Sequence, residues 1–266
     1  MFQELKCKVC GRIGKKGLVF LRGAAMLTVC SLLMRTVGVG FNVYITGVLG
    51  AGGVGLFSLI TSAYGFFSTF ALSGVNLAAS KLCAEGIGHE CADEVRGVMR
   101  RCLAYSLCFG GCATLLMLAL SYPIGVCLIG DAGSVRSLRI LAPSLLPLSL
   151  SSGIYGYLHA VRRVGKSAVL QIGEQLARIL FTVLLFRTLM PSGAPEACAL
   201  VSLGITFSEL IAFSVGIIIF YRDITQHLPP QGIRLPGLTR RMLSISLPMA
   251  LSSYMRSGLL TLEHML

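Results

Sequence analysis

Long apolar stretches without a charged residue constrain this chain more than any other feature. Residues 53–80, 102–130 and 140–158 contain no charged residue, and residues 197–221 contain only Glu209. A helix needs roughly 20 residues to cross a hydrocarbon core about 30 Å thick, and these stretches reach that length. Only 13% of the residues are charged, whereas soluble domains contain roughly a quarter. The sequence therefore predicts a protein whose main solvent is lipid.

Apolar runs and their basic or Gly/Pro borders divide the sequence into seven predicted spans. They lie at residues 18–49, 54–83, 99–129, 137–160, 167–190, 197–221 and 242–264. All should be helices, because lipid offers backbone groups no other hydrogen-bond partners. The first span is too long for one straight crossing, and Gly38 and Gly40 offer a bend. The predicted fold class is an all-α, polytopic transmembrane bundle.

The basic residues indicate the orientation of this bundle. The net charge is +12, which by itself would be compatible with nucleic-acid binding. Most of the Lys and Arg residues, however, fall in the amino-terminal segment and in the connections near residues 81–101, 162–166 and 222–241. These segments alternate along the chain, as the positive-inside rule requires of cytoplasmic connections. We therefore expect a cytoplasmic amino terminus and no nucleic-acid partner.

The sequence contains no motif of soluble-enzyme chemistry. It has no phosphate-binding glycine loop followed by Lys-Ser/Thr, no paired-histidine metal motif and no serine nucleophile elbow. Cys7 and Cys10 have the spacing of zinc ligands, but no second Cys/His pair lies nearby. We therefore expect no enzyme activity, no metal and no cofactor. Without an ATPase motif, transport would be driven by a gradient or by the substrate.

Two arginines lie inside predicted spans that have similar local sequences. Arg35 has Asn42 seven residues after it, and Arg256 has Glu263 at the same offset. An arginine in the centre of a membrane helix costs about 2.5–3.5 kcal/mol on insertion scales, so each needs a partner or a water-filled cavity. Arg35 has no acidic residue near it on its own helix and is a candidate for binding an anion. For Arg256 two alternatives remain: its side chain extends to the membrane interface, or it shares a helix face with Glu263, which could itself be solvated.

Three further charged residues lie in the fifth and sixth predicted spans. Glu174 and Arg178 are four residues apart, about 40° around a helix, and are close enough to pair. They form either a structural ion pair or part of a cavity lining. Glu209 has no partner on its own helix. It is protonated, paired with another helix, or a proton-binding site.

An ordered set of short motifs resembles one known family. They are MRTVG (34–38), GAGGVGLF (50–57), SGVNLAASK (73–81), LRILAP (138–143), GIYGY (153–157), QIGEQLAR (171–178), and Leu247-Pro248 leading to RSG (256–258). No single motif is specific, but their order and spacing over residues 17–266 resemble the polysaccharide-biosynthesis and stage V sporulation protein B branch of the multidrug/oligosaccharidyl-lipid/polysaccharide (MOP) exporter superfamily.

The resemblance implies a flippase with two helical lobes around a central cavity, of the type shared with multidrug (MATE) exporters. Its substrate would be a lipid-linked saccharide or cell-wall precursor with an anionic pyrophosphate. The protein would lie in the plasma membrane of a bacterial cell. Arg35, which matches the family's first-helix arginine, and Arg256 would contact the anion. Glu174 and Arg178 would lie near the lobe interior.

The resemblance also implies a division of the chain. Residues 1–17 would be a basic cytoplasmic segment, 18–222 a six-helix first lobe, 223–241 a cytoplasmic loop, and 242–266 the first helix of a second lobe. Because family members are about twice as long, we expect either a partial chain or a half-size protein that dimerises.

Two other functions remain open at this point. One is an exporter of cationic drugs from the same superfamily, which would need an unpaired carboxylate in the cavity. The other is a membrane scaffold in envelope assembly that transports nothing.

Overall fold

The computed structural model describes the backbone of residues 2–89, 92–189, 191, 193–227 and 238–265. Within these ranges it describes the side chains of residues 25, 28–50, 52–89, 92–163, 165–189, 191, 193–225 and 239–259. Helices account for nearly all of the described part, and no strand occurs in it. The predicted all-α class is confirmed.

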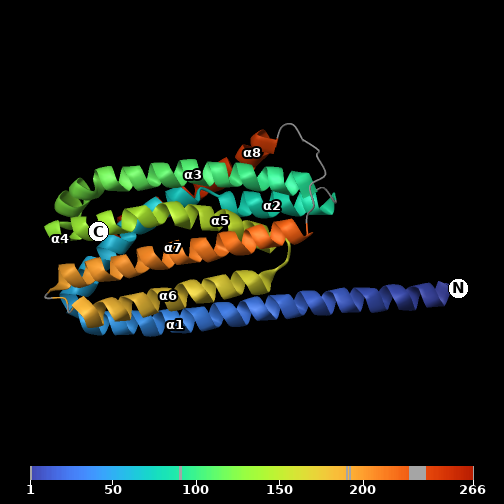
Figure 1. Ribbon diagram of the computed structural model, residues 1–266, viewed down its shortest axis with the longest axis horizontal. Coiled ribbons are helices and arrows are strands. Elements are labelled where there is room, and N and C mark those ends of the chain that lie inside the picture. Colours follow the sequence, from blue (N-terminus) through green and yellow to red (C-terminus); the bar gives the residue numbers. More distant parts are fainter. Residues whose placement is uncertain (1, 90–91, 190, 192, 228–237, 266) are drawn as a thin grey trace.

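The helices follow one another with short connections (Figure 1). They are α1 (Phe2–Leu72), α2 (Val75–Gly88), α3 (Ala92–Pro123), the π-helix η1 (Ile124–Ile129), α4 (Ala132–Leu141), the 3₁₀ turn η2 (Ala142–Ser144), α5 (Leu145–Ala160), α6 (Val164–Leu189), α7 (Ala194–His227) and α8 (Leu238–Met265).

Five helical segments among the described residues are long and apolar enough to cross a membrane. They are Thr28–Gly50, Gly52–Gly88, Ala92–Ile129, Gly165–Leu189 and Ala194–Thr225, and they match five of the seven predicted spans. The predicted span at 137–160 is divided by η2, which contains Pro143 and leaves α5 with 16 residues. The span at 242–264 falls in α8, which carries Arg240, Arg241 and Arg256. These two crossings stay predictions.

The long helix α1 consists of two helices that meet at Gly50. Gly50 has φ 69° and ψ 176°, a conformation essentially restricted to glycine because a β-carbon would clash with the backbone. The backbone keeps helical angles at Gly38 and Gly40, so our expectation of a bend there is wrong. The chain reverses at the border between the first two predicted spans instead.

A second break divides the predicted span at 54–83. Ser73 and Gly74 have positive φ angles, 41° and 71°, between the end of α1 and the start of α2. The carbonyl oxygen of Ser246 in α8 lies 2.9 Å from the position that a β-carbon on Gly74 would take. Glycine at this position therefore allows both the left-handed turn and the close approach of α8.

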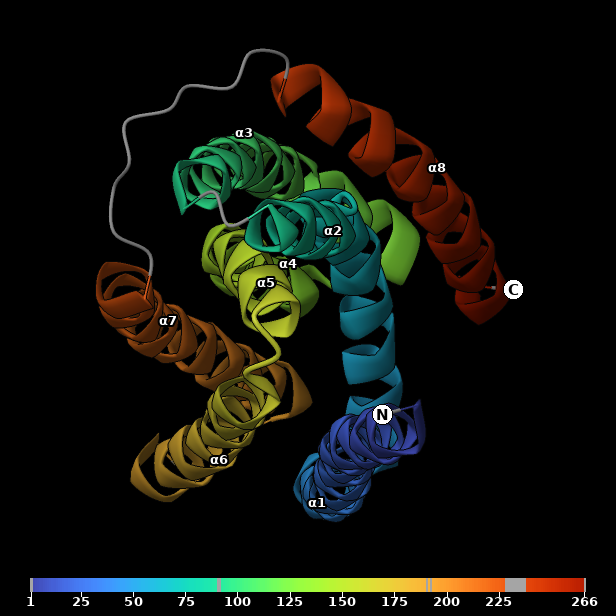
Figure 2. The same cartoon turned by 90° about the vertical axis from the view of Figure 1, so that its right-hand side faces the viewer.

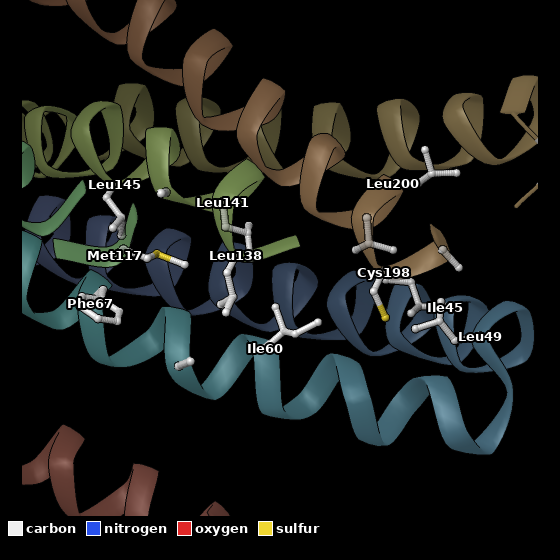
Figure 3. Packing of buried hydrophobic residues seen from close by; sticks show 14 of the residues in the cluster. Ile45, Leu49, Ile60, Phe67, Met117, Leu138, Leu141, Leu145, Cys198 and Leu200 are labelled. Atoms are coloured by element: carbon white, nitrogen blue, oxygen red, sulfur yellow. The ribbon is translucent and has the colours of Figure 1, made fainter. Parts of the chain in front are cut away.

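Buried apolar side chains form two clusters, one on each side of this break. The first includes Ile60, Met117, Leu138 and Cys198 and joins α1, α3, α4 and α7 (Figure 3). The second joins α2, α3, α5, α6, α7 and α8 and includes Tyr157, which is fully buried. Large apolar side chains also remain exposed on the outer faces of α3, α6 and α7, as expected for surfaces that contact lipid.

Alternate connections lie at opposite ends of the bundle. The α2–α3 and α5–α6 connections and the C-terminal end of α7 lie at the same end as the amino terminus (Figure 1). The Gly50 turn and the α6–α7 connection lie at the other end. Lys81, Arg96, Arg163 and Lys166 all belong to segments at the first end. This arrangement agrees with the alternation of basic segments along the sequence.

Helix α8 lies beside the other helices at one edge of the bundle. Seen end-on, it is separated from α6 and α7 by the central helices (Figure 2). It contacts α1, α2 and α3, and Arg241 donates a hydrogen bond of 3.0 Å to Glu85 of α2. Helix α8 is thus attached along the side of the bundle where α1 turns into α2.

Candidate functional site

A cavity of about 640 Å³ lies between the two parts of α1 and reaches α8. Its size falls in the range of small-molecule sites, roughly 300–1,000 Å³. Most of its lining residues are polar but uncharged: Asn42, Thr46, Ser58, Thr61, Ser62, Ser68, Thr69 and Ser257. The turn at Gly50 creates this cavity, because it folds the second part of α1 back beside the first.

The structure relates two predicted site residues, Asn42 and Arg35, to this cavity. Asn42 lines it. Arg35 lies seven residues earlier in the same continuous helix, so the two side chains are about 20° apart around the axis and about 10 Å apart along it. Arg35 is exposed and forms no ion pair with any residue whose side chain is described. Arg35 is not among the residues that line the cavity, but its unpaired guanidinium lies on the same face of α1 as Asn42.

Arg256 has a comparable environment on α8. It is exposed, and the next residue, Ser257, lines the cavity. Arg256 has no ion-pair partner within the described part of the chain. The side chain of Glu263 lies outside the described residues, so its predicted relation to Arg256 stays a prediction.

The remaining predicted charges form one network in the interior of the bundle. Arg178 of α6 donates to Glu174 at 2.9 Å, as the spacing of four residues predicts, and to Glu209 of α7 at 3.2 Å. Glu209 is only 4% exposed. Tyr155 of α5 donates to the other oxygen of Glu174 at 3.2 Å. Of the three alternatives for Glu209, the structure supports pairing with another helix.

The charges in this network do not balance. Two carboxylates share one guanidinium, and the described part contains no other basic side chain bound to either carboxylate. When both carboxylates are ionised, the group carries one negative charge in excess. Helices α6 and α7 hold the network, and both lie on the far side of the bundle from α8 (Figure 2).

A second charged cluster, which the sequence did not predict, lies at the amino-terminal end of the bundle. Asp223 of α7 is fully buried. Its carboxylate accepts hydrogen bonds from Tyr157 at 3.0 Å and from Lys166 at 2.6 Å, and Arg163 donates to it as well. The cluster connects α5, α6 and α7. The sequence predicts a loop at 223–241 that includes Asp223, whereas α7 continues to His227.

A hydroxyl cluster at the Ser73–Gly74 break was also missed. The Ser73 hydroxyl is hydrogen-bonded to Tyr105 of α3 at 3.0 Å and to Tyr254 of α8 at 2.8 Å. The Tyr254 hydroxyl also donates to the carbonyl of Phe70 at 3.4 Å. Only the SGVN motif marks this position in the sequence, and it does not reveal the two tyrosines.

The described residues contain no group of three or more His, Cys, Asp and Glu side chains that could hold a metal ion. The side chains of Cys7 and Cys10 lie outside the described part. The expectation of no metal and no cofactor therefore stays a prediction.

Comparison with known proteins agrees with this fold. The model of a family described as "Polysaccharide biosynthesis protein" matches residues 20–265. Stage V sporulation protein B of Bacillus subtilis (strain 168) is 24% identical over 191 residues, which are 72% of this chain and 37% of the relative. Lipid II flippase MurJ of the same strain is 26% identical over 211 residues, which are 76% of this chain and 38% of the relative. The chain thus spans well under half the length of these relatives.

A solved structure has the same arrangement of helices. A MOP superfamily transporter from Pyrococcus furiosus Vc1 (DSM3638) superposes with a TM-score of 0.72 at 14% identity, over 85% of this chain and 51% of that one. One relative is a flippase by name and the solved structure is that of a transporter, and the apolar helices of this chain identify a multi-pass membrane protein. The chain therefore belongs to the polysaccharide biosynthesis protein family.

Proposed function

We propose that the native protein containing this sequence is a flippase that carries a lipid-linked saccharide across the bacterial plasma membrane. The observation that carries the proposal is the unpaired Arg35 on the cavity face of α1, two helical turns from Asn42. The name of one relative, a lipid II flippase, supports the same class of activity. A contribution to spore-envelope assembly is compatible with the other relative.

The charge of the site suits an anionic substrate. Arg35 and Arg256 lie next to the cavity lining and have no carboxylate partners among the described residues, so an anion bound at the edge of the cavity would neutralise them. Guanidinium groups bind phosphate oxygens through two parallel hydrogen bonds, and such charge-assisted bonds are among the strongest in proteins. We assign the pyrophosphate of the substrate to Arg35, with Arg256 as a second contact.

Export of a cationic drug is less compatible with this charge distribution. A cationic substrate requires a carboxylate in the cavity, whereas no acidic residue is among those that line it. Glu174 and Glu209 bind Arg178 instead, and Glu209 is buried.

The excess carboxylate at Arg178 provides a place for a coupling proton. A lone uncompensated charge is expensive in a membrane interior, so a proton on Glu209 or Glu174 would balance the group. We assign Glu209 as the proton-binding residue because it is the more deeply buried of the two carboxylates, with a side chain 5% exposed against 20% for Glu174.

The cavity also requires a second wall. The described helices line it from α1 and from one residue of α8, and a second lobe or a second copy of the chain would complete it. In this proposal residues 18–222 are the first lobe, α8 begins the second, and the amino terminus lies in the cytoplasm.

Translocation of a lipid-linked saccharide in proteoliposomes tests the proposal. The native protein is expected to move a polyprenyl diphosphate that carries one N-acetylhexosamine between leaflets at a rate well above that of protein-free liposomes. A fluorescent cationic dye should not be transported. The proposal fails if the dye is moved and the saccharide lipid is not, and movement of neither compound would favour the scaffold.

A further inference from the structure

The wall of the cavity is lined by neutral hydrogen-bonding groups, unlike the charged guanidinium groups of Arg35 and Arg256. None of its lining residues is ionisable. The polar ones are hydroxyl-bearing except for the amide Asn42. We call Thr46, Ser58, Thr61, Ser62 and Thr69 the hydroxyl wall.

Three hydroxyls in this wall already donate a hydrogen bond to a backbone carbonyl of their own helix. Thr46 donates to the carbonyl of Asn42, Thr61 to that of Phe57, and Thr69 to that of Gly65. A hydroxyl has one donor and two acceptor lone pairs, so these three oxygens can offer the cavity only acceptors. Ser58 and Ser62 make no such bond to another described residue, and they keep both a donor and acceptors.

This distribution selects for particular chemical groups. An ionised phosphate has acceptor oxygens only, so it can accept from Ser58 and Ser62 but cannot bond to the three threonine oxygens, which offer only acceptors. An ammonium group has donors, but its charge would be left without a carboxylate in this cavity. A saccharide hydroxyl both donates and accepts and carries no charge. The wall therefore matches an uncharged polyol.

We propose that the hydroxyl wall is a subsite for the saccharide of the substrate, separate from the diphosphate at Arg35. The inference rests on the proposed function, and it names the residues that contact the saccharide. The position of Arg35, about 10 Å along α1 from Asn42, allows a diphosphate and its first sugar to contact both places. Phe57, also in the lining, offers an apolar ring surface for the C–H face of the sugar.

Two lipid probes that differ only in the sugar test this inference. One is a polyprenyl diphosphate without a saccharide, and the other carries one N-acetylhexosamine. Binding of each to the native protein in nanodiscs is compared before and after Thr61→Val and Ser62→Ala. Each change should weaken binding of the saccharide probe by about 2- to 10-fold, the usual range for one neutral hydrogen bond. Binding of the sugar-free probe should stay unchanged.

Thr188→Val is the matched control. The Thr188 hydroxyl donates to the carbonyl of Leu184 in its own helix, as Thr61 does to Phe57, but Thr188 is exposed on α6 and does not line the cavity. It should alter binding of neither probe. Ser62→Ala removes no intrahelical bond, so it remains informative if Thr61→Val disturbs the helix.

The outcomes separate the two proposals. The saccharide subsite is overturned if the Thr61 and Ser62 variants bind both probes equally more weakly, or bind both as well as the native protein does. Either result leaves the flippase proposal in place. Failure of the unchanged protein to bind either probe would overturn the proposed function and the subsite with it.

Discussion

Replacing Arg35 with alanine is expected to reduce translocation of a polyprenyl diphosphate saccharide by about 10- to 100-fold. Loss of a hydrogen bond to a charged group costs about 1.5–3 kcal/mol, and 1.4 kcal/mol corresponds to a factor of ten. The loss should be large because Arg35 has no carboxylate partner among the described residues that would weaken its pull on an anion. The measurement is the rate of probe movement between leaflets in proteoliposomes.

Two further variants show whether the effect comes from the charge at this position. Arg35→Lys keeps the cation but loses the paired geometry of the guanidinium, so it should retain an intermediate rate. Arg187→Ala removes an exposed arginine from the last turn of α6 and should have no effect. Normal translocation by Arg35→Ala, with normal insertion into the membrane, would contradict the assignment of Arg35.

Replacing Arg178 with methionine is expected to lower the free energy of unfolding by about 3–5 kcal/mol, the usual cost of removing one partner from a buried ion pair. The variant would leave Glu174 and Glu209 in the bundle interior without the guanidinium that binds both. Equilibrium unfolding in detergent micelles measures the change.

Removing the carboxylates together with the arginine separates charge from packing. The triple variant Glu174→Gln, Arg178→Met and Glu209→Gln carries no uncompensated charge and should recover most of the lost stability. Arg187→Met, on the same helix but exposed, should cost little. If the triple variant is as unstable as Arg178→Met alone, the network does not act through its charges.

Features that depend on local sequence could be predicted. The first two spans meet at Gly50, as the glycine-rich border between them suggested, and Glu174 pairs with Arg178 at the predicted spacing. Such contacts depend on helix geometry alone. The resemblance to the polysaccharide-biosynthesis family rested on the order of many short motifs, and the match of that family over residues 20–265 confirms it.

Features that depend on contacts between distant segments could not be predicted. Glu209 had no partner on its own helix, and only the packing of α7 against α6 brings it to Arg178. Asp223 was assigned to a loop because polar residues follow it, yet it is buried against α5 and α6. The break at Ser73–Gly74 lies inside an uncharged stretch, where hydropathy shows no boundary.

The hydroxyl-lined cavity illustrates the same limit. Gly65 and Ser68 line the cavity, whereas Gly110 packs closely against Ser149 of α5. Small residues allow both close helix contacts and open space, so sequence alone does not separate these roles.

Protection of a cysteine introduced at Asn42 tests most directly whether the α1 face holds the substrate. A membrane-impermeant thiol reagent is expected to label Asn42→Cys in the native protein, and a polyprenyl diphosphate saccharide should slow this labelling. Thr188→Cys, exposed on α6 and outside the cavity, should be labelled at the same rate with and without the lipid. If the Asn42→Cys variant still moves the lipid but the lipid does not slow its labelling, the account is contradicted. The substrate would then cross the membrane without occupying the cavity at Asn42.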